Sequence, residues 1–161
     1  MAIKFGVAFG CEVTVISTSL SKREDAKKLG AKNFLLSSDP DAMAAAAGSL
    51  DGIVNCISAK HDQGPLFNLL DVDGKMVMVG VPPEPMAVHA FWLIGMQRSL
   101  VGSLIGGVKE TQEMLDFCGQ HSIVSDIEMI KPDYVNEAYE RMLKSDVKYR
   151  FVLDMASLLK K

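Results

Sequence analysis

Residues 12–23 read EVTVISTSLSKR, and this stretch decides the fold of the chain. Its β-branched first half ends abruptly in hydroxyl residues and two cations, a pattern that predicts a strand running into an anion-seeking loop. Ser21 followed by Glu24 matches a capping box, so we expect the next helix to begin there. A strand, a polar loop and a helix in direct succession are typical of a nucleotide-binding α/β fold.

The polar loop has no carboxylate at the place where many nucleotide-binding folds need one. A Rossmann unit that binds NAD puts an acidic residue at the tip of its second strand, where it accepts hydrogen bonds from the ribose 2′-hydroxyl. Here Ser17 and Thr18 occupy that place and Lys22 follows. Hydroxyl donors and a cation suit a 2′-phosphate, which a carboxylate would repel. The residues favour an NADP(H) pocket, and a polar loop ahead of a well-capped helix is the alternative.

Composition and charge narrow the class of protein. The 161 residues are 48% hydrophobic with a formal charge of −3, which allows a globular core but gives no basic excess for nucleic acid or an anionic membrane. The apolar runs are too short to span a bilayer and no secretory signal pattern is present, so we expect a cytoplasmic protein. Three isolated cysteines, Cys11, Cys56 and Cys118, predict reduced and mostly buried thiols.

Apolar runs alternate with segments of helical periodicity. We expect strands at 13–16, 34–36, 52–57, 75–80 and 99–104, and helices at 1–9, 21–29, 42–47, 66–70, 90–97 and 109–120. Asp41 is expected to cap the helix at 42–47, and Asp73-Gly74 to turn into the strand at 75–80. Strands that are apolar on both faces and alternate with helices predict an α/β fold with a doubly wound parallel sheet.

Six segments of the chain form a pattern when taken together. They are 13–19 (VTVISTS), 29–31 (LGA), 73–75 (DGK), 109–114 (KETQEM), 133–136 (DYVN) and 147–152 (VKYRFV). The pattern resembles plant cinnamyl alcohol dehydrogenases, which belong to the zinc-dependent medium-chain alcohol dehydrogenases, and it covers nearly the whole chain. The resemblance implies a homodimeric oxidoreductase of lignin (phenylpropanoid) biosynthesis that reduces cinnamaldehydes with NADPH. It also implies a catalytic zinc held by a separate domain and a structural zinc held by four cysteines.

The resemblance assigns cofactor contacts residue by residue. The family's hydroxyl cluster and the lysine after it, which hold the 2′-phosphate, match Ser17, Thr18, Ser19 and Lys22. The family's walls around adenosine, ribose and nicotinamide match the carboxyl ends of later strands, where an open α/β sheet binds ligands. These further expected contacts are Ile57, Gly80, Val81, Gly102, Ser103 and Leu104. Simple turn-making is the alternative interpretation of the glycines, more so for Gly80 than for Gly102.

The chain departs from the family pattern at its start. A family member has a first strand and a glycine-rich pyrophosphate loop just before the helix at 1–9, and neither is found here. We therefore expect an incomplete sheet in which strands 13–16 and 53–57 each present an unpaired edge. The family's zinc ligands and proton relay are missing too, so no residue is predicted to be catalytic or to bind a metal. His61, His89 and His121 are too scattered for a replacement site and are expected to be surface or packing residues.

The resemblance predicts two domains. Residues 1–125 are expected to form a partial NADP-binding Rossmann domain, and residues 126–161 the segment with which the family's chain returns to its catalytic domain. The second part is expected to hold a strand at 127–130, a helix at 134–144 and a strand at 149–153. The apolar strand at 100–104 is expected to lie at the edge of the sheet. Either this strand or the segment near Met86 to Val88 is expected to pair with its twin across a twofold axis.

Three functional hypotheses follow. The first is the cofactor-binding and C-terminal part of an NADPH-dependent alcohol dehydrogenase, inactive alone, whose full-length form converts small aldehydes and alcohols. The second is a non-catalytic dimerisation or interaction module, a homodimer or a heterodimer with a full-length relative. The third is a truncated product without function. Related plant dehydrogenases act on sugar or terpenoid alcohols, so the sequence leaves the substrate open.

Overall fold

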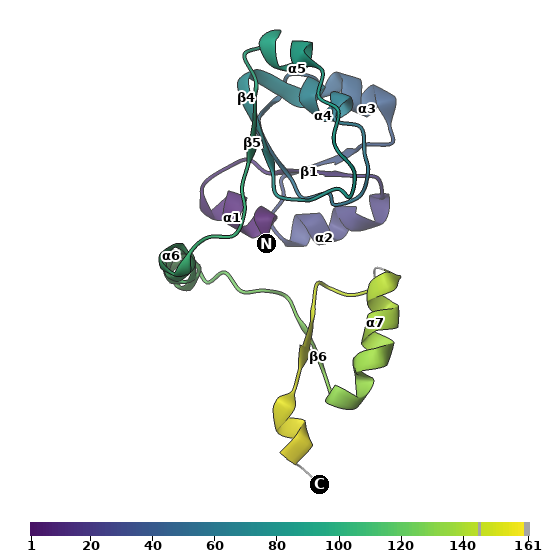
Figure 1. Cartoon of the computed structure of the whole chain (residues 1–161), viewed down its shortest axis with the longest axis vertical. Helices are drawn as coiled ribbons and strands as arrows, with labels where there is room; N and C mark the ends of the chain where they lie inside the picture. Colours follow the sequence, from purple (N-terminus) through teal and green to yellow (C-terminus); the bar gives the residue numbers. More distant parts are fainter. Residues whose placement is uncertain (145, 160–161) are drawn as a thin grey trace. The chain divides into compact units, whose positions relative to one another are not determined.

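The computed structural model describes residues 1–144 and 146–159, which form two compact units, Met1–Met114 and Leu115–Lys161 (Figure 1). Each unit is described by itself. The helices and strands of the first unit are α1 (Ala2–Ala8), β1 (Thr14–Ser17), α2 (Arg23–Lys28), β2 (Asn33–Leu36), α3 (Pro40–Ala45), β3 (Leu50–Asn55), α4 (Gly64–Leu69), β4 (Leu70–Met78), α5 (Ala90–Ile94) and β5 (Ser99–Gly102), with a 3-10 turn η1 (Leu20–Lys22) before α2. Helix α6 (Val108–Gln120) contains the boundary between the units.

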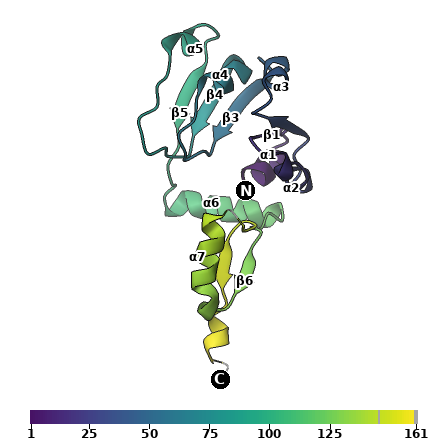
Figure 2. The same cartoon turned by 90° about the vertical axis from the view of Figure 1, so that its right-hand side faces the viewer.

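The strands of the first unit form two parallel sheets instead of one. β1 pairs with β2, while β3, β4 and β5 pair in that order, and all pairs are parallel. Figure 2 shows β3, β4 and β5 side by side and β1 apart from them. The order β2-β1 followed by β3-β4-β5 is the doubly wound order with its central strand missing, because the first strand of such a sheet lies between the second and the fourth. The expected incomplete sheet with two unpaired strand edges is confirmed.

Helices lie on both sides of these strands, as expected for a doubly wound fold. Figure 1 shows α1 and α2 on one side and α3, α4 and α5 on the other. The turn after α2 lies close to α1. Gly30 in this turn has φ +102°, and a Cβ there would lie 3.0 Å from a methyl group of Val7 in α1. Glycine therefore allows the turn and the close approach of α1 together.

The hydrophobic core of the first unit lies on one face of the three-stranded sheet. Cross-strand neighbours Ile53, Met76 and Leu100 form a row that packs against α4, whose Phe67 and Leu69 are fully buried. The next row, Val54, Val77 and Val101, points to the opposite face, and there Val54 is 56% exposed and Val101 43% exposed. Strands that are apolar on both faces are typical of a sheet that is covered on both sides, but none of the described residues covers this row fully.

Three local expectations are corrected. The capping box does not form: Ser21 lies in η1, where its hydroxyl bonds that of Ser19, and α2 begins only at Arg23 with no side-chain cap. Asp39, not Asp41, caps α3 by accepting hydrogen bonds from the amides of residues 41 and 42. Asp73 with φ 59° is an irregularity inside β4, not a turn before it, because β4 pairs with β3 on both sides of that point.

Among the described residues the three cysteines form no disulfide, as expected, but they are not mostly buried. Cys11 and Cys56 are exposed, and Cys118 is half-buried. Strand β3 ends at Asn55, so Cys56 lies beyond it, and Cys11 follows the end of α1. Within the described residues, no helix combines the length and the apolar character that a membrane crossing requires.

The second unit contains the end of α6 and a small α/β assembly. β6 (Glu128–Ile130) pairs in parallel with β7 (Phe151–Leu153), and α7 (Val135–Leu143) connects them through a 3-10 turn η2 (Pro132–Tyr134). A further 3-10 helix η3 (Met155–Leu159) follows. Arg141 joins the elements: it donates to Glu128 at 2.7 Å and to Asp146 at 2.9 Å, and it lies 4.8 Å from the ring centre of Phe151.

The carboxylate of Glu128 makes the stability of the second unit depend on pH. The backbone N–H of Lys148 and then the Arg141 guanidinium lower the pKa of Glu128 below its ordinary 4.5. Because the folded pKa is the lower one, its contribution is complete above pH 4.5 and is lost as the pH falls through the folded pKa. We expect Glu128→Gln to weaken this acid dependence. The measurement is amide exchange of Asp154, whose N–H donates to the Ile130 carbonyl at 2.8 Å, between pH 6 and about 3. Glu137→Gln on the exposed face of α7 is the control, and an equal effect of both variants would contradict the assignment.

Candidate cofactor site

The loop at the carboxyl end of β1 is organised by its own hydroxyl groups. The Ser17 hydroxyl accepts a hydrogen bond from the Ser19 amide at 3.2 Å, and the hydroxyls of Ser19 and Ser21 lie 2.8 Å apart. Ser17 and Ser19 are half-buried, whereas the side chains of Thr18 and Lys22 are exposed. Hydrogen bonds among its own groups hold the loop, and its exposed side chains include those of Thr18 and Lys22.

Acidic residues near this loop lie in the helix, not at the strand tip. Glu24 and Asp25 occupy the first turn of α2, where they complement the positive helix terminus. Arg23 lies over the ring of Phe34 at 5.4 Å. The strand tip itself carries only hydroxyl groups, so the geometry retains the feature that favours a 2′-phosphate over a ribose 2′-hydroxyl.

The carboxyl ends of β3 and β4 are in direct backbone contact. The carbonyl of Asn55 accepts hydrogen bonds from the amides of Val79 and Gly80, each at 3.0 Å. A Cβ at Gly80 would lie 2.5 Å from the carbonyl oxygen of Ile57. Glycine at position 80 is therefore required by this close approach of two backbones, which supports the structural interpretation of Gly80.

A buried polar network holds the loop that follows β3. The Asn55 side chain is buried; its oxygen accepts from the Ile57 amide at 3.0 Å, and its nitrogen lies 2.9 Å from His61 Nε2 and 3.2 Å from Gln63 Oε1. The Gln63 nitrogen also lies 2.9 Å from His61 Nε2 and 3.3 Å from the sulfur of Met86. His61 Nδ1 lies 2.8 Å from the Ala59 carbonyl, to which it donates, so Nε2 is the acceptor for both amides.

This network connects the loop after β3 with the proline-rich loop after β4, and Asn55 and Gln63 were missed at the level of sequence. The one available signal was an asparagine at the end of an otherwise apolar strand, since a buried amide needs partners. His61 was expected to be a surface or packing residue, and the structure gives it a definite structural role in this network.

The end of β5 is open. Gly102 pairs with Met78 of β4, and a Cβ at Gly102 would meet nothing within 4 Å. The Ser103 amide donates to the Met78 carbonyl at 3.0 Å, which continues the sheet by one residue, and Leu104 is 87% exposed. No described neighbour requires glycine at position 102, in contrast to position 80.

The structure brings one group of predicted contacts together and leaves the other apart. Ile57, Gly80, Val81, Gly102, Ser103 and Leu104 all lie at the carboxyl ends of the adjacent strands β3, β4 and β5, where Ile57, Val81 and Leu104 expose apolar side chains. Ser17, Thr18, Ser19 and Lys22 follow β1, in the other sheet. The two groups thus belong to two sheets that no described strand connects.

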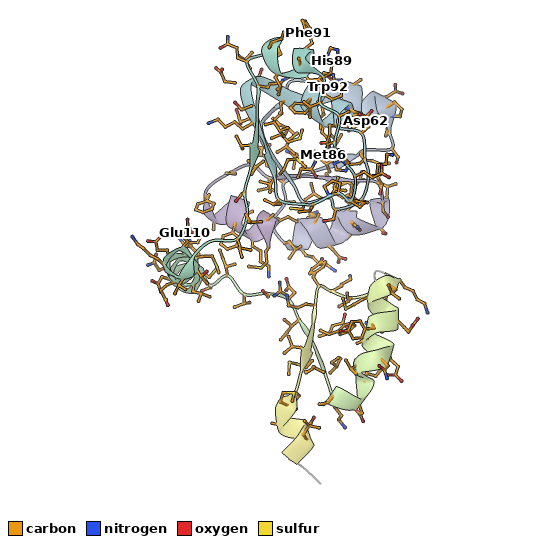
Figure 3. All side chains as sticks on the ribbon, in the orientation of Figure 1. Asp62, Met86, His89, Phe91, Trp92 and Glu110 are labelled. Carbon is orange, nitrogen blue, oxygen red and sulfur yellow. The ribbon has the colours of Figure 1, made fainter. Side chains whose placement is uncertain are left out.

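Side chains around α5 and α6 have local structural roles. His89 accepts a hydrogen bond from the Phe91 amide at 3.2 Å and so caps α5. Asp62 accepts a hydrogen bond from the Gly64 amide at 3.0 Å. Figure 3 shows His89 and Asp62 near Trp92. At the start of α6, Glu110 accepts from the Gly107 amide at 2.7 Å. The ring of His121 packs on the ring of Phe117, with the two ring centres 4.2 Å apart. Among the described residues, no three His, Cys, Asp or Glu side chains are placed to hold a metal ion.

Replacement of each of the two strand-end glycines by alanine is expected to change the free energy of unfolding by different amounts. Gly80→Ala forces a Cβ against the Ile57 carbonyl, so we expect it to lower the free energy of unfolding by about 2 kcal/mol. Gly102→Ala is expected to change it by less than about 0.5 kcal/mol, because the space there is open. Urea unfolding followed by the fluorescence of Trp92, the single tryptophan, measures both. Equal effects of the two variants would show that the backbone contact at Gly80 is not tight.

Comparisons with known proteins agree with this fold. Residues 1–120 match the family model described as "Zinc-binding dehydrogenase". The NADP-dependent alcohol dehydrogenase C of Mycobacterium bovis is 54% identical over 98% of this chain and 46% of its own length, and the 8-hydroxygeraniol dehydrogenase of Catharanthus roseus is 53% identical over 99% of this chain and 45% of its own length. Both curated relatives are about twice as long as this chain.

Solved structures give the same result. A cinnamyl alcohol dehydrogenase from Sorghum bicolor aligns with a TM-score of 0.92 and 48% identity over 97% of this chain and 44% of its own. The Helicobacter pylori protein CAD, solved as a complex with NADP(H), aligns with a TM-score of 0.83 and 36% identity over 97% of this chain and 44% of its own. The fold is thus that of the cofactor-binding region of alcohol dehydrogenases, and the chain belongs to the zinc-binding dehydrogenase family. Its relatives act on several alcohols in plants and bacteria.

Proposed function

We propose that this chain is the NADP(H)-binding and C-terminal part of an alcohol dehydrogenase that interconverts aldehydes and alcohols. The observation that carries the proposal is the loop after β1, where Ser17, Thr18 and Lys22 offer donors and no carboxylate stands at the strand tip. The printed names of an NADP-dependent relative and of an NADP(H) complex support the same cofactor. Residues 1–125 supply this cofactor domain, and residues 126–161 the segment that returns to a catalytic domain.

In the proposal, the two groups of predicted contacts bind different parts of the cofactor. Ser17, Thr18, Ser19 and Lys22 bind the 2′-phosphate through hydroxyl groups, a backbone amide and an ammonium group. The exposed apolar residues Ile57, Val81 and Leu104, with Ser103 and the space beside Gly102, form the surface for the rest of the cofactor. The network of Asn55, His61 and Gln63 holds the loop that carries Ile57.

The substrate in the proposal is a small aldehyde or alcohol of the cinnamyl type. The support is the structural similarity to the Sorghum bicolor enzyme together with the quoted sequence pattern. The described residues contain no group that fits the family's zinc, so we assign no catalytic step to this chain and propose that it does not turn over substrate by itself. A catalytic zinc and the residues around the substrate would belong to a separate domain.

A chimaeric enzyme tests this function directly. Residues 1–161 replace the matching region of the Mycobacterium bovis relative, and the purified protein is assayed with NADPH and coniferaldehyde. We expect NADPH-dependent reduction by the chimaera and none by residues 1–161 alone. A folded, zinc-loaded chimaera that oxidises no NADPH would contradict the function, and turnover by residues 1–161 alone would contradict the assignment of catalysis to another domain.

The proposal includes association through the edge of the three-stranded sheet. β5 has β4 as its one strand neighbour among the described residues, and its Val101 is 43% exposed, so the predicted edge position is confirmed. Apolar edge strands without charge are protected in stable proteins, and pairing with a twin or with a full-length relative provides that protection. We expect a dimer by light scattering at micromolar concentration. A monodisperse monomer at high micromolar concentration would contradict this part of the proposal.

A further inference from the structure

Two loops at the carboxyl ends of β3 and β4 are joined to each other. The loop after β3 leads into α4, and the loop after β4 leads into α5. Lys60 of the first loop pairs with Glu84 of the second at 2.7 Å. The Gln63 nitrogen of the first loop donates to the sulfur of Met86, labelled in Figure 3, at 3.3 Å. A change in one loop therefore reaches the other.

The hydrogen bonds of the first loop fix the direction of each side-chain amide. The Ile57 amide donates to the Asn55 oxygen at 3.0 Å. The Asn55 nitrogen therefore faces His61 and Gln63, and the Gln63 oxygen accepts from it. This turns the Gln63 nitrogen toward His61 Nε2 and the Met86 sulfur. Each amide nitrogen uses both of its N–H groups, so reversal of one amide disturbs its neighbours.

His61 Nε2 is the atom at which the two amides meet. It accepts from the Asn55 and Gln63 nitrogens, each at 2.9 Å. His61 Nδ1 donates to the Ala59 carbonyl at 2.8 Å. All of these partners are uncharged, and only a neutral imidazole has a lone pair at Nε2. The arrangement therefore requires a neutral ring with its one proton on Nδ1.

The charged and titratable side chains of the neighbouring elements have other partners. Lys60 and Glu84 pair with each other. Asp62 accepts from the first amide of α4, and His89 accepts from an amide of α5. No carboxylate of the described residues bonds to the ring of His61, whose hydrogen bonds go to two amides and a carbonyl. A second proton on this ring would have no anionic partner.

A second proton on the ring is incompatible with this set of bonds. The new Nε2–H group would face two N–H groups. Rotation of the Gln63 amide alone gives it an acceptor but turns the Gln63 nitrogen toward the Asn55 nitrogen. Rotation of both amides removes that conflict, but the Asn55 nitrogen then faces the Ile57 amide, and the Gln63 oxygen faces the Met86 sulfur. Protonation therefore breaks the hydrogen bond that holds Ile57 and the contact that joins the two loops.

We propose that His61 is a positioning residue for the cofactor that acts only in its neutral form, so that protonation of Nε2 weakens NADP(H) binding. The inference rests on the proposed function, in which Ile57 and Val81 contact the cofactor. Ile57 is 43% exposed, and a Cβ on Gly80 would lie 2.5 Å from its carbonyl oxygen, so a shift of Ile57 reaches Gly80 and the adjacent Val81. Histidine changes its charge between about pH 8 and pH 5, which makes this binding pH-dependent.

NMR of the 161-residue chain without cofactor tests the hydrogen bonds by themselves. At pH 8 we expect the ring ¹⁵N shifts of His61 to show the Nδ1–H tautomer. As the pH falls to 5, we expect Nε2 to take up a proton and the protection factor of the Ile57 amide to fall at least tenfold. An Nε2–H ring at pH 8, a ring that stays neutral down to pH 5, or an unchanged protection factor would each overturn the proposal.

Substitutions separate the acceptor atom from the titrating ring. His61→Gln puts an amide oxygen, which does not titrate, near the position of Nε2, and His61→Leu removes the acceptor. His121→Gln, in the segment after α6, is the matched control. We expect the Ile57 protection factor to stay within twofold from pH 8 to 5 in His61→Gln, to be low throughout in His61→Leu, and to follow the wild type in His121→Gln. Wild-type protection at pH 8 in His61→Leu would overturn the proposal.

Calorimetric titration of the chimaeric enzyme with NADP⁺, which is stable in acid, connects these bonds with the cofactor. The dissociation constant is measured at pH 8 and pH 5 for the wild type and the three variants, which share the titration of the 2′-phosphate. We expect the wild type to lose at least fivefold more affinity than His61→Gln as the pH falls. Equal losses would overturn the inference alone. A chimaera that binds no NADP⁺ at pH 8 would contradict the proposed function and the inference with it, even with the expected NMR result.

Discussion

Replacing Thr18 by Asp in the chimaeric enzyme is expected to reverse its preference from NADP(H) to NAD(H). The exposed Thr18 hydroxyl lies at the tip of β1, where a carboxylate would repel a 2′-phosphate and accept hydrogen bonds from a ribose 2′-hydroxyl. A charge-assisted contact of this kind is worth about 1.5–3 kcal/mol, or roughly one to two decades in affinity. The ratio of kcat/KM values for NADPH and NADH measures the change.

Two controls make this result specific. Thr18→Asn keeps a polar side chain of similar size without the charge, and we expect it to lower the NADPH preference by less than Asp does. Asn68→Asp adds the same charge at an exposed position of α4, away from the loop after β1, and we expect nearly unchanged selectivity. A Thr18→Asp enzyme that keeps its full NADPH preference would show that the loop after β1 does not contact the 2′-phosphate.

Replacing Asn55 by Ala is expected to lower the free energy of unfolding of the first unit by about 3 kcal/mol. The change removes the acceptor of the Ile57 amide and the donor to the buried Gln63 Oε1, whereas His61 Nε2 keeps the Gln63 nitrogen at 2.9 Å. Each group left without a partner costs about 1–3 kcal/mol. Trp92 fluorescence in urea reports the change, because Trp92 packs on the buried Phe67 with ring centres 5.7 Å apart.

An exposed asparagine provides the matched control for Asn55. Asn33 at the start of β2 donates to Glu12 at 2.9 Å, but its side chain is in solvent. We expect Asn33→Ala to change the free energy of unfolding by less than about 0.5 kcal/mol. If Asn55→Ala is equally mild, then water satisfies the freed groups and the network does not hold the loop that carries Ile57.

The order of strands was predictable from sequence because it follows from periodicity and from a general rule of topology. Apolar runs separated by helices predict parallel strands, and the doubly wound order places the absent strand between β1 and β3. The free edges of both strands were expected on that ground and are confirmed. The edge position of β5 was expected for the same reason.

Helix starts were less predictable because several residues compete for the same role. Asp39 and Asp41 flank Pro40, and proline prefers the first helical position, so the residue before it is the better cap. That argument would have selected Asp39. At α2, the 3-10 turn η1 takes Ser21 into its own hydrogen bonding, which a sequence pattern does not reveal.

Contacts between distant residues were the least predictable part of the candidate site. Gly80 is fixed by the carbonyl of Ile57, and Asn55 by His61 and Gln63, and these pairs are set by how two loops meet. The exposure of Val54 and Val101 was also missed. An apolar strand is interpreted as buried on both faces unless the elements that pack against each face are known. The cofactor contacts assigned by resemblance stay predictions.

A titration of the isotope-labelled 161-residue chain with adenosine 2′-monophosphate tests whether the loop after β1 binds a 2′-phosphate. This ligand carries the 2′-phosphate without the remainder of the cofactor, so it probes the loop after β1 alone. We expect saturable NMR shifts of the Thr18, Ser19 and Lys22 amides in the millimolar range, with much smaller shifts from adenosine 5′-monophosphate and none in Thr18→Asp. Equal shifts from the two nucleotides, or shifts that leave residues 17–22 unchanged, would contradict it.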